Sequence, residues 1–135
     1  MRILDHQGQS SETWRAGVQT RMRVSALTGA QQLCVFEQWC APGAGAPDHL
    51  HAVEEVLTVL SGKAEVWLDD ETATVTSGQS LVVPAGHRHG FRNIGTDTLH
   101  VQATLAAPMF EAAFSDQREV SRRWLPASRA PARLT

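Results

Sequence analysis

Short apolar and β-branched segments recur along this chain, separated by glycine, proline and aspartate. Within each segment, apolar and polar residues alternate or form a brief apolar run, which is typical of half-buried or buried strands. The helical signal is poor. The pattern predicts an all-β domain, either a sandwich or a small barrel, with strands at residues 32–40, 54–60, 63–68, 72–76, 80–84, 90–94 and 98–105.

Turn signals separate these predicted strands. The stretches LSGK (60–63) and LDDET (68–72) predict tight turns. The stretch APGAGAPD (41–48) predicts a loop, whose glycines allow sharp changes of direction and which leads the chain to His49.

Two of the predicted strands indicate which side faces the core. In residues 98–105 every second side chain from Leu99 to Leu105 is apolar, so His100 should point outward. The two faces of residues 34–40 carry Cys34, Phe36, Gln38 and Cys40 on one side, and Val35, Glu37 and Trp39 on the other.

The two cysteines lie at the ends of that strand. At about 3.3 Å per residue, the Cα atoms of Cys34 and Cys40 would be roughly 20 Å apart, whereas a disulfide requires about 7 Å or less. We therefore expect free thiols, which suit a reducing compartment.

Length and composition limit the classes of function. The chain has 135 residues and a mass of 14.7 kDa, which fits one domain. With 42% hydrophobic residues, 19% charged residues and a net charge of -2, it has no electrostatic preference for nucleic acid. No apolar run approaches the roughly 20 residues that span a bilayer, and the first residues lack the apolar core of a signal peptide. We expect a cytoplasmic protein.

The candidate chemistry lies in two histidine pairs. In a strand, His49 and His51 would project from one face, and Glu55 shares their parity while Glu54 should face away. A second pair, His87 and His89, shows the same spacing. Three imidazoles and one carboxylate would form a mixed nitrogen and oxygen metal site with room for water or substrate.

At these positions the chain resembles the cupin superfamily. The first cupin motif, G-x5-H-x-H-x3-E-x6-G, and the second, G-x5-P-x-G-x2-H-x3-N, are both complete, at Gly43, His49, His51, Glu55 and Gly62, and at Gly78, Pro84, Gly86, His89 and Asn93. The resemblance implies a small antiparallel jelly-roll β barrel. It also implies one divalent transition metal ion (iron, manganese, nickel, copper or zinc) bound by His49, His51, Glu55 and His89.

The same resemblance divides the chain and implies pocket residues. Residues 1–30 would form the N-terminal strand region of the barrel, 31–108 the barrel core with both motifs, and 109–135 an arginine-rich tail packing on the barrel or on a partner subunit. Within the first region, WRAGVQTRMRV (14–24) is similar to the N-terminal strand of quercetinase-like small bacterial cupins. By likeness to other small cupins, Phe36 and Gln38 line the substrate pocket. Phe91, two residues after His89, should share its inward face. For His87 three roles stay open: a pocket-rim or hydrogen-bonding position beside the metal ligands, an alternative metal ligand, or simple surface exposure.

The absence of tyrosine narrows the reaction class. Several branches of the superfamily rely on a tyrosine at the reacting centre, and this chain has none. A dioxygenase-like enzyme acting on a small oxygenated organic substrate remains, with Glu55 as both ligand and base. The alternatives are a non-oxidative isomerase, lyase or decarboxylase, and a cupin that binds or senses a small molecule without catalysis. Small cupins usually pair, so we also expect a homodimer.

Overall fold

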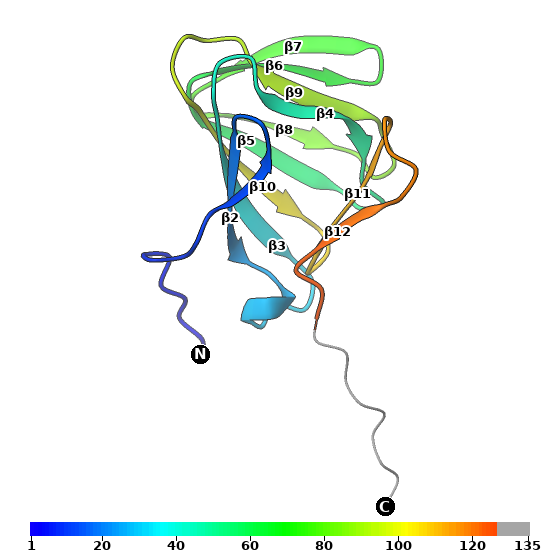
Figure 1. The fold of residues 1–135 in the computed structure, drawn as a ribbon. Helices are drawn as coiled ribbons and strands as arrows, with labels where there is room; N and C mark the ends of the chain where they lie inside the picture. Colours follow the sequence, from blue (N-terminus) through cyan, green and yellow to red (C-terminus); the bar gives the residue numbers. More distant parts are fainter. Residues whose placement is uncertain (127–135) are drawn as a thin grey trace, which may run out of the picture.

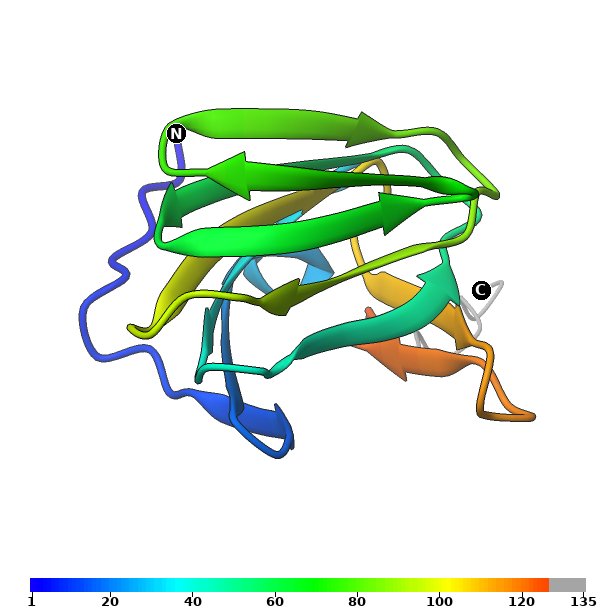
Figure 2. The same cartoon turned by 90° about the horizontal axis from the view of Figure 1, so that it is seen from above.

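The computed structural model describes residues 1–126 and has the predicted all-β fold. Within this range, twelve strands form two six-stranded antiparallel sheets that face each other as a jelly-roll barrel (Figures 1 and 2). The first sheet contains, in order, β1 (Glu12–Arg15), β2 (Val18–Val24), β3 (Cys34–Cys40), β10 (Leu99–Leu105), β5 (Glu55–Ser61) and β8 (Gln79–Val83). The second contains β12 (Ser121–Arg123), β11 (Phe110–Phe114), β4 (Gly45–Leu50), β9 (His89–Asn93), β6 (Lys63–Leu68) and β7 (Glu71–Thr76).

All seven strands predicted from the sequence are present, with ends shifted by one or two residues. The loop predicted for residues 41–48 is partly wrong, because β4 already begins at Gly45. There Gly45 and Ala46 pair with Arg92 and Phe91 of β9. A Cβ at Gly45 would lie 2.0 Å from the Phe91 carbonyl oxygen, so glycine is what allows this strand to approach its neighbour closely.

The segment after residue 108 contributes directly to the barrel. Strand β11 pairs with β4, placing Phe114 opposite His49, and β12 pairs with the outer side of β11. On β12, Arg122 pairs with Glu111 and Arg123 with Glu12. The arginines at positions 129 and 133 lie outside the described residues.

The predicted alternation of β10 is confirmed. Its apolar side chains from Leu99 to Leu105 are buried, each contributing about 1 to 3 kcal/mol to folding. His100 points outward, where its Nε2 lies 2.7 Å from Glu37 Oε1 and its ring stacks on Trp39. Burial thus fixes which face of the first sheet lines the interior.

Both cysteines are buried free thiols, as predicted. Burial raises the pKa of Cys34 to about 12 and that of Cys40 to about 11. Both thiols are therefore protonated at neutral pH and behave as small apolar core groups.

Four aromatic rings form a cluster in the core. The ring of Trp14 lies 4.6 Å from that of Phe110 and 5.5 Å from those of Phe36 and Trp124 (centroid distances). Glu12 ties the cluster together, because its carboxylate accepts hydrogen bonds from both indole nitrogens, at 3.0 Å from Trp14 and 3.2 Å from Trp124. The N- and C-terminal strands are thereby joined beside the cavity described below.

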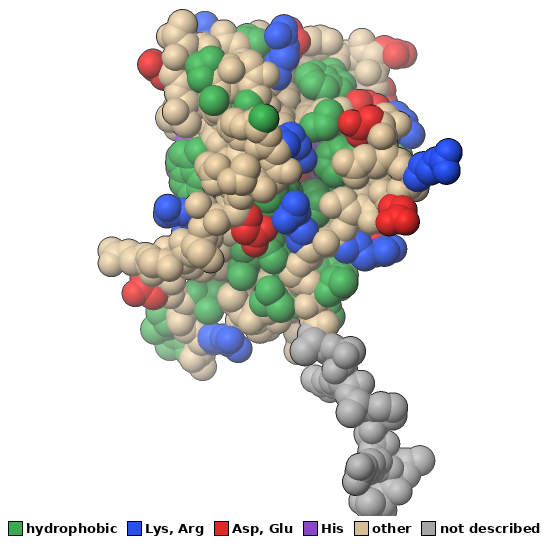
Figure 3. All heavy atoms as spheres, in the orientation of Figure 1, with side chains coloured by type: hydrophobic (Ala, Val, Ile, Leu, Met, Phe, Trp, Pro, Cys, Tyr) green, Lys and Arg blue, Asp and Glu red, His purple; other side chains and the backbone are tan. Residues whose placement is uncertain are grey.

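In the part of the chain that the structure describes, no helix has the length and apolar character needed to cross a membrane. Basic and acidic side chains are interspersed over the face shown in Figure 3, in keeping with the small net charge.

Candidate metal site

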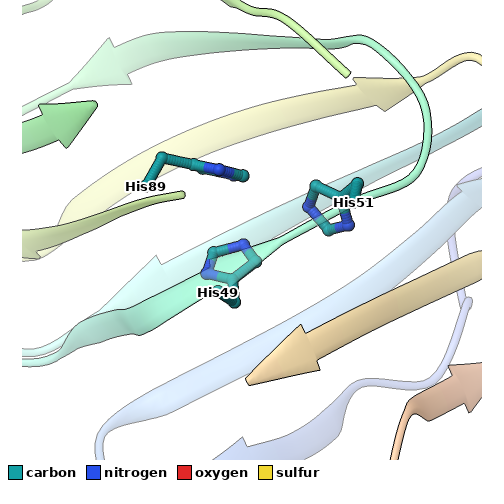
Figure 4. A group of neighbouring side chains, drawn as sticks. All are labelled: His49, His51 and His89. Carbon is teal, nitrogen blue, oxygen red and sulfur yellow. The ribbon is translucent and has the colours of Figure 1, made fainter. Parts of the chain in front are cut away.

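Three buried histidines converge inside the barrel. His49 is near the end of β4, His51 follows that strand, and His89 is the first residue of β9. An irregularity in β4 between Ala46 and His49 sets His49 directly opposite His89 in the paired strands. Each ring offers one nitrogen, and these three atoms all lie within 4.8 Å of one another; Figure 4 shows the rings turned toward a common point.

Backbone carbonyls fix the orientation of all three rings. The Nδ1 atom of His49 lies 2.7 Å from the Pro47 oxygen, that of His51 2.7 Å from the Glu111 oxygen, and that of His89 2.9 Å from the His87 oxygen. Because a carbonyl only accepts, each Nδ1 carries the hydrogen, and each neutral ring presents its Nε2 lone pair. Metal-binding histidines are held in this way.

The Glu55 carboxylate adjoins the same point. Glu55 opens β5, is 5% exposed, and places Oε1 3.1 Å from His89 Nε2 and Oε2 3.4 Å from His51 Nε2. Burial raises the pKa of Glu55, but contact with His51 and His89, and the positive charge that these rings carry when protonated, outweigh burial and lower the pKa to about 2. The group is a carboxylate at neutral pH.

Two of the histidines have opposite pKa shifts. Burial, followed by the nearby His89 and His51, lowers the pKa of His49 to about 3, so this ring is neutral near pH 7. For His51, burial lowers the pKa, but contact with the Glu55 carboxylate and its charge together raise it above the ordinary 6.5.

This donor set fits a divalent metal ion. The Nε2 of His51 is buried and has no hydrogen-bond partner among residues 1–126. An unpartnered buried lone pair facing a carboxylate is unfavourable, whereas a cation between them would satisfy both. Three imidazole nitrogens with an adjacent carboxylate suit iron, manganese, nickel, copper or zinc.

The candidate site lies in an inner cavity of about 20 Å³. The three predicted pocket residues, Phe36, Gln38 and Phe91, line this cavity together with the histidines and Glu55. Gln38 is buried, and its Nε2 donates to Thr20 Oγ1 at 3.0 Å. The lining is otherwise mostly apolar, so water is largely excluded from the donor atoms.

Sequence reasoning also missed several other lining residues, among them Trp14, Arg15, Phe110 and Phe114. Phe110 and Phe114 lie on one face of β11, where buried and half-buried positions alternate, and this alternation is visible in the sequence FEAAF. Trp14 and Arg15 are consecutive, so simple alternation would place them on opposite faces.

The His87 side chain does not support the predicted hydrogen-bonding position beside the metal ligands. That side chain is 46% exposed, and its Nδ1 lies 2.5 Å from Asp69 Oδ2 on the surface. The prediction of simple surface exposure fits the His87 side chain, because His87 lies in the turn before β9 rather than within a strand. Its backbone carbonyl nevertheless orients His89.

Comparison with known proteins decides the family. Residues 37–105 match the model of the cupin domain family Cupin_2. This chain belongs to the cupin family. Its two complete motifs supply the three histidines and the glutamate of this cluster.

This cupin is similar in sequence to proteins from a bacterium and a plant. It is 35% identical over 79 residues to the polyketide synthase CurC of Streptomyces cyaneus, covering 58% of this chain and 49% of that protein. It is 26% identical over 93 residues to auxin-binding protein 1 of Arabidopsis thaliana, covering 62% and 47%. The chain thus spans about half the length of these relatives.

Solved structures share the fold. The polyketide cyclase RemF from Streptomyces resistomycificus has a TM-score of 0.70 at 21% identity, covering 93% of this chain and 87% of that one. KdgF from a Halomonas species has a TM-score of 0.67 at 19% identity, covering 76% and 93%.

Proposed function

We propose that this cupin is a metal-dependent enzyme acting on a small, oxygenated and largely apolar molecule with an enolisable carbonyl group. The observation that carries the proposal is the convergence of three oriented Nε2 lone pairs and one carboxylate in a cavity with aromatic walls. A divalent ion held by His49, His51, His89 and Glu55 would supply Lewis-acid polarisation of a substrate oxygen.

The chain's own groups support proton abstraction. Among the described residues that line the inner cavity, Glu55 is the one carboxylate, so it is the candidate to take a proton from the carbon beside the carbonyl. Phe36 and Phe91 exclude water from this carbon. Gln38, held by Thr20, is proposed to orient the substrate.

We favour ring closure of a polyketide-type substrate as the outcome. The similarity to the polyketide synthase CurC and to the polyketide cyclase RemF supports this substrate class. After Glu55 removes the proton, the resulting carbon nucleophile would form a bond to a second carbonyl carbon of the same molecule. The oxygen of that carbonyl would then take the proton from Glu55, which gives a hydroxyl group on the product and restores the Glu55 carboxylate.

A dioxygenase-like reaction is the second candidate, favoured by the presence of one carboxylate and no further carboxylic acid among the described residues lining the inner cavity. In this version Glu55 is ligand and base, and both atoms of dioxygen add to the deprotonated substrate. It requires no additional acid.

The test is turnover of aryl polyketones, flavonols and catechols by protein loaded with iron(II), nickel or zinc, followed by an oxygen electrode and mass spectrometry. Ring closure predicts a product of unchanged mass, or one lighter by a water molecule, without oxygen uptake. A product that gains two oxygen atoms with matching oxygen uptake would support the dioxygenase. Ligand binding without any product, with metal bound, would contradict an enzymatic role.

Glu55→Gln and Glu54→Gln form a matched pair for this assay. Glu54 is exposed and precedes β5, whereas Glu55 faces the histidines. We expect Glu55→Gln to lower kcat at least about 100-fold, because general-base catalysis contributes about that much or more. Glu54→Gln should retain wild-type kcat. Equal activities of the two variants would contradict Glu55 as the base.

A further inference from the structure

The inner cavity is too small for an organic substrate. A volume of about 20 Å³ accommodates roughly one water molecule or one ion. A second cavity of about 240 Å³ adjoins it and shares four of its lining residues: Trp14, Arg15, Phe110 and Phe114. A molecule with one reacting group at the histidines must therefore have most of its body in this outer cavity.

Arg15 lies where the two cavities meet. Although consecutive strand residues normally point to opposite sides, Trp14 and Arg15 both line both cavities. The cause is a bulge in β1, where the pairing with β2 shifts between Thr13 and Arg15. Bulges of this kind redirect side chains and are frequent beside active sites.

The Arg15 guanidinium is held in place but not neutralised. Its Nη1 donates to the Gly45 carbonyl oxygen at 3.1 Å, and its Cζ lies 5.3 Å from the centre of the Phe114 ring. Arg15 is partly buried and makes no ion pair within residues 1–126. A partly buried cation without a counter-ion is costly, so the cavity is predisposed to accept an anion.

The other charged groups of the outer cavity differ from Arg15. Arg123 lies 4.3 Å from the centre of the Trp14 ring and is already paired with Glu12 at 3.1 Å. Asp116 also lines the outer cavity and its charge acts on Arg15 from a distance, but Asp116 is exposed and forms no ion pair with Arg15. The guanidinium that remains available to a ligand is that of Arg15.

We propose that Arg15 binds a carboxylate of the substrate while the oxygenated reacting end lies at the three histidines. The inference rests on the proposed function and defines its substrate class further: an elongated, mostly aromatic molecule with an anionic group at the end remote from the reaction. The planar guanidinium can bind a carboxylate with two parallel hydrogen bonds. Trp14, Phe110 and Phe114 would contact the apolar body between the two ends.

The experiment compares two probes of nearly equal shape, 6-hydroxy-2-naphthoate and its neutral carboxamide, by calorimetric titration of the metal-loaded protein. Wild type should bind the carboxylate at least about tenfold more tightly, as expected for one charge-assisted pair. Arg15→Gln should abolish this preference. Arg122→Gln removes an arginine of β12 that pairs with Glu111 on the surface, and should leave the preference unchanged. An unchanged preference in Arg15→Gln would overturn the proposal.

Repeating the titrations after removal of metal with a chelator separates the inference from the proposed function. If Arg15 binds the carboxylate, the preference persists in metal-free wild type. A preference that disappears with the metal but survives Arg15→Gln means that the carboxylate goes to the metal, which overturns the role of Arg15 and retains the metal site. Should Arg15→Gln fail to fold, raising the ionic strength for wild type provides the second test: the preference should shrink for a contact at the cavity mouth, and a salt-independent preference contradicts it.

Discussion

The two His-x-His pairs of this chain have the same spacing, yet they occupy different environments. His49 and His51 are both buried, and both rings present Nε2 to the Glu55 side of the cavity. Of the second pair, His89 is buried, whereas His87 is exposed beside Asp69. Identical spacing therefore does not give identical placement.

Local backbone geometry explains the difference. His49 lies in β4, and the carbonyl of Glu111 on the adjacent strand β11 anchors His51 just beyond the strand end. The second pair follows a turn in which Gly86 has a φ of 80°, and β9 begins only at His89. Alternation from β4 therefore still holds at His51, where the Glu111 carbonyl orients the ring, but it does not hold at His87, which belongs to the turn before β9.

The largest effect should come from removing a ligand. His89→Ala should abolish stoichiometric metal binding, and in excess metal its melting temperature should fall by about 10 °C or more, because metal bound only by the folded state stabilises it. His87→Ala is the matched control from the same pair and should retain wild-type metal content. Metal analysis and thermal melts check both. Loss of metal in His87→Ala would show that the assignments within this pair are reversed.

A smaller effect is expected when the pH is changed, because metal binding competes with a proton on His51. The pKa of His51 is raised in the metal-free protein, so near pH 6 its ring is largely protonated, and this proton must leave before Nε2 can bind a metal. Affinity should therefore fall by about tenfold per pH unit below that pKa and level off above it. Calorimetry in buffers of different ionisation enthalpy should show about one proton released per metal near pH 6. Binding without proton release would contradict the inferred protonation of His51.

The smallest effect is expected at the exposed member of the second pair. Asp69→Asn removes the ion-pair partner of His87, but both side chains are about half exposed. Such a surface contact contributes about 0.5 kcal/mol or less to the free energy of unfolding. Urea denaturation should detect a change within that range, and metal content should stay at the wild-type value. A loss above 2 kcal/mol would mean that this contact supports the site.

Much of the fold could be predicted because the alternation of β3 and β10 is regular and each buries one face. The two cupin motifs likewise gave the residues that the structure brings together, since the spacing from His49 to Glu55 spans the end of one strand and the start of another. Local sequence contains this information.

The remaining parts of the fold and of the cavity depend on features that the alternation of apolar and polar residues does not reveal. Trp14 and Arg15 face the same cavity because of a bulge, which has no distinctive residue pattern in ETWR. Sequence alone places β11 in a tail, because its pairing with β4 joins positions more than sixty residues apart. The close approach of β4 to β9 similarly depends on Gly45, which in the sequence is typical of a loop.

The geometry of the site predicts that His49, His51 and His89 bind one metal ion through Nε2. The most direct test is a crystal structure of the metal-loaded protein with an anomalous difference map collected at the absorption edge of the metal. We expect one strong peak per chain at about 2.0 to 2.2 Å from all three Nε2 atoms, with a Glu55 oxygen beside it. A peak bound by His87, or no peak among the three rings in protein shown to contain metal, would contradict it.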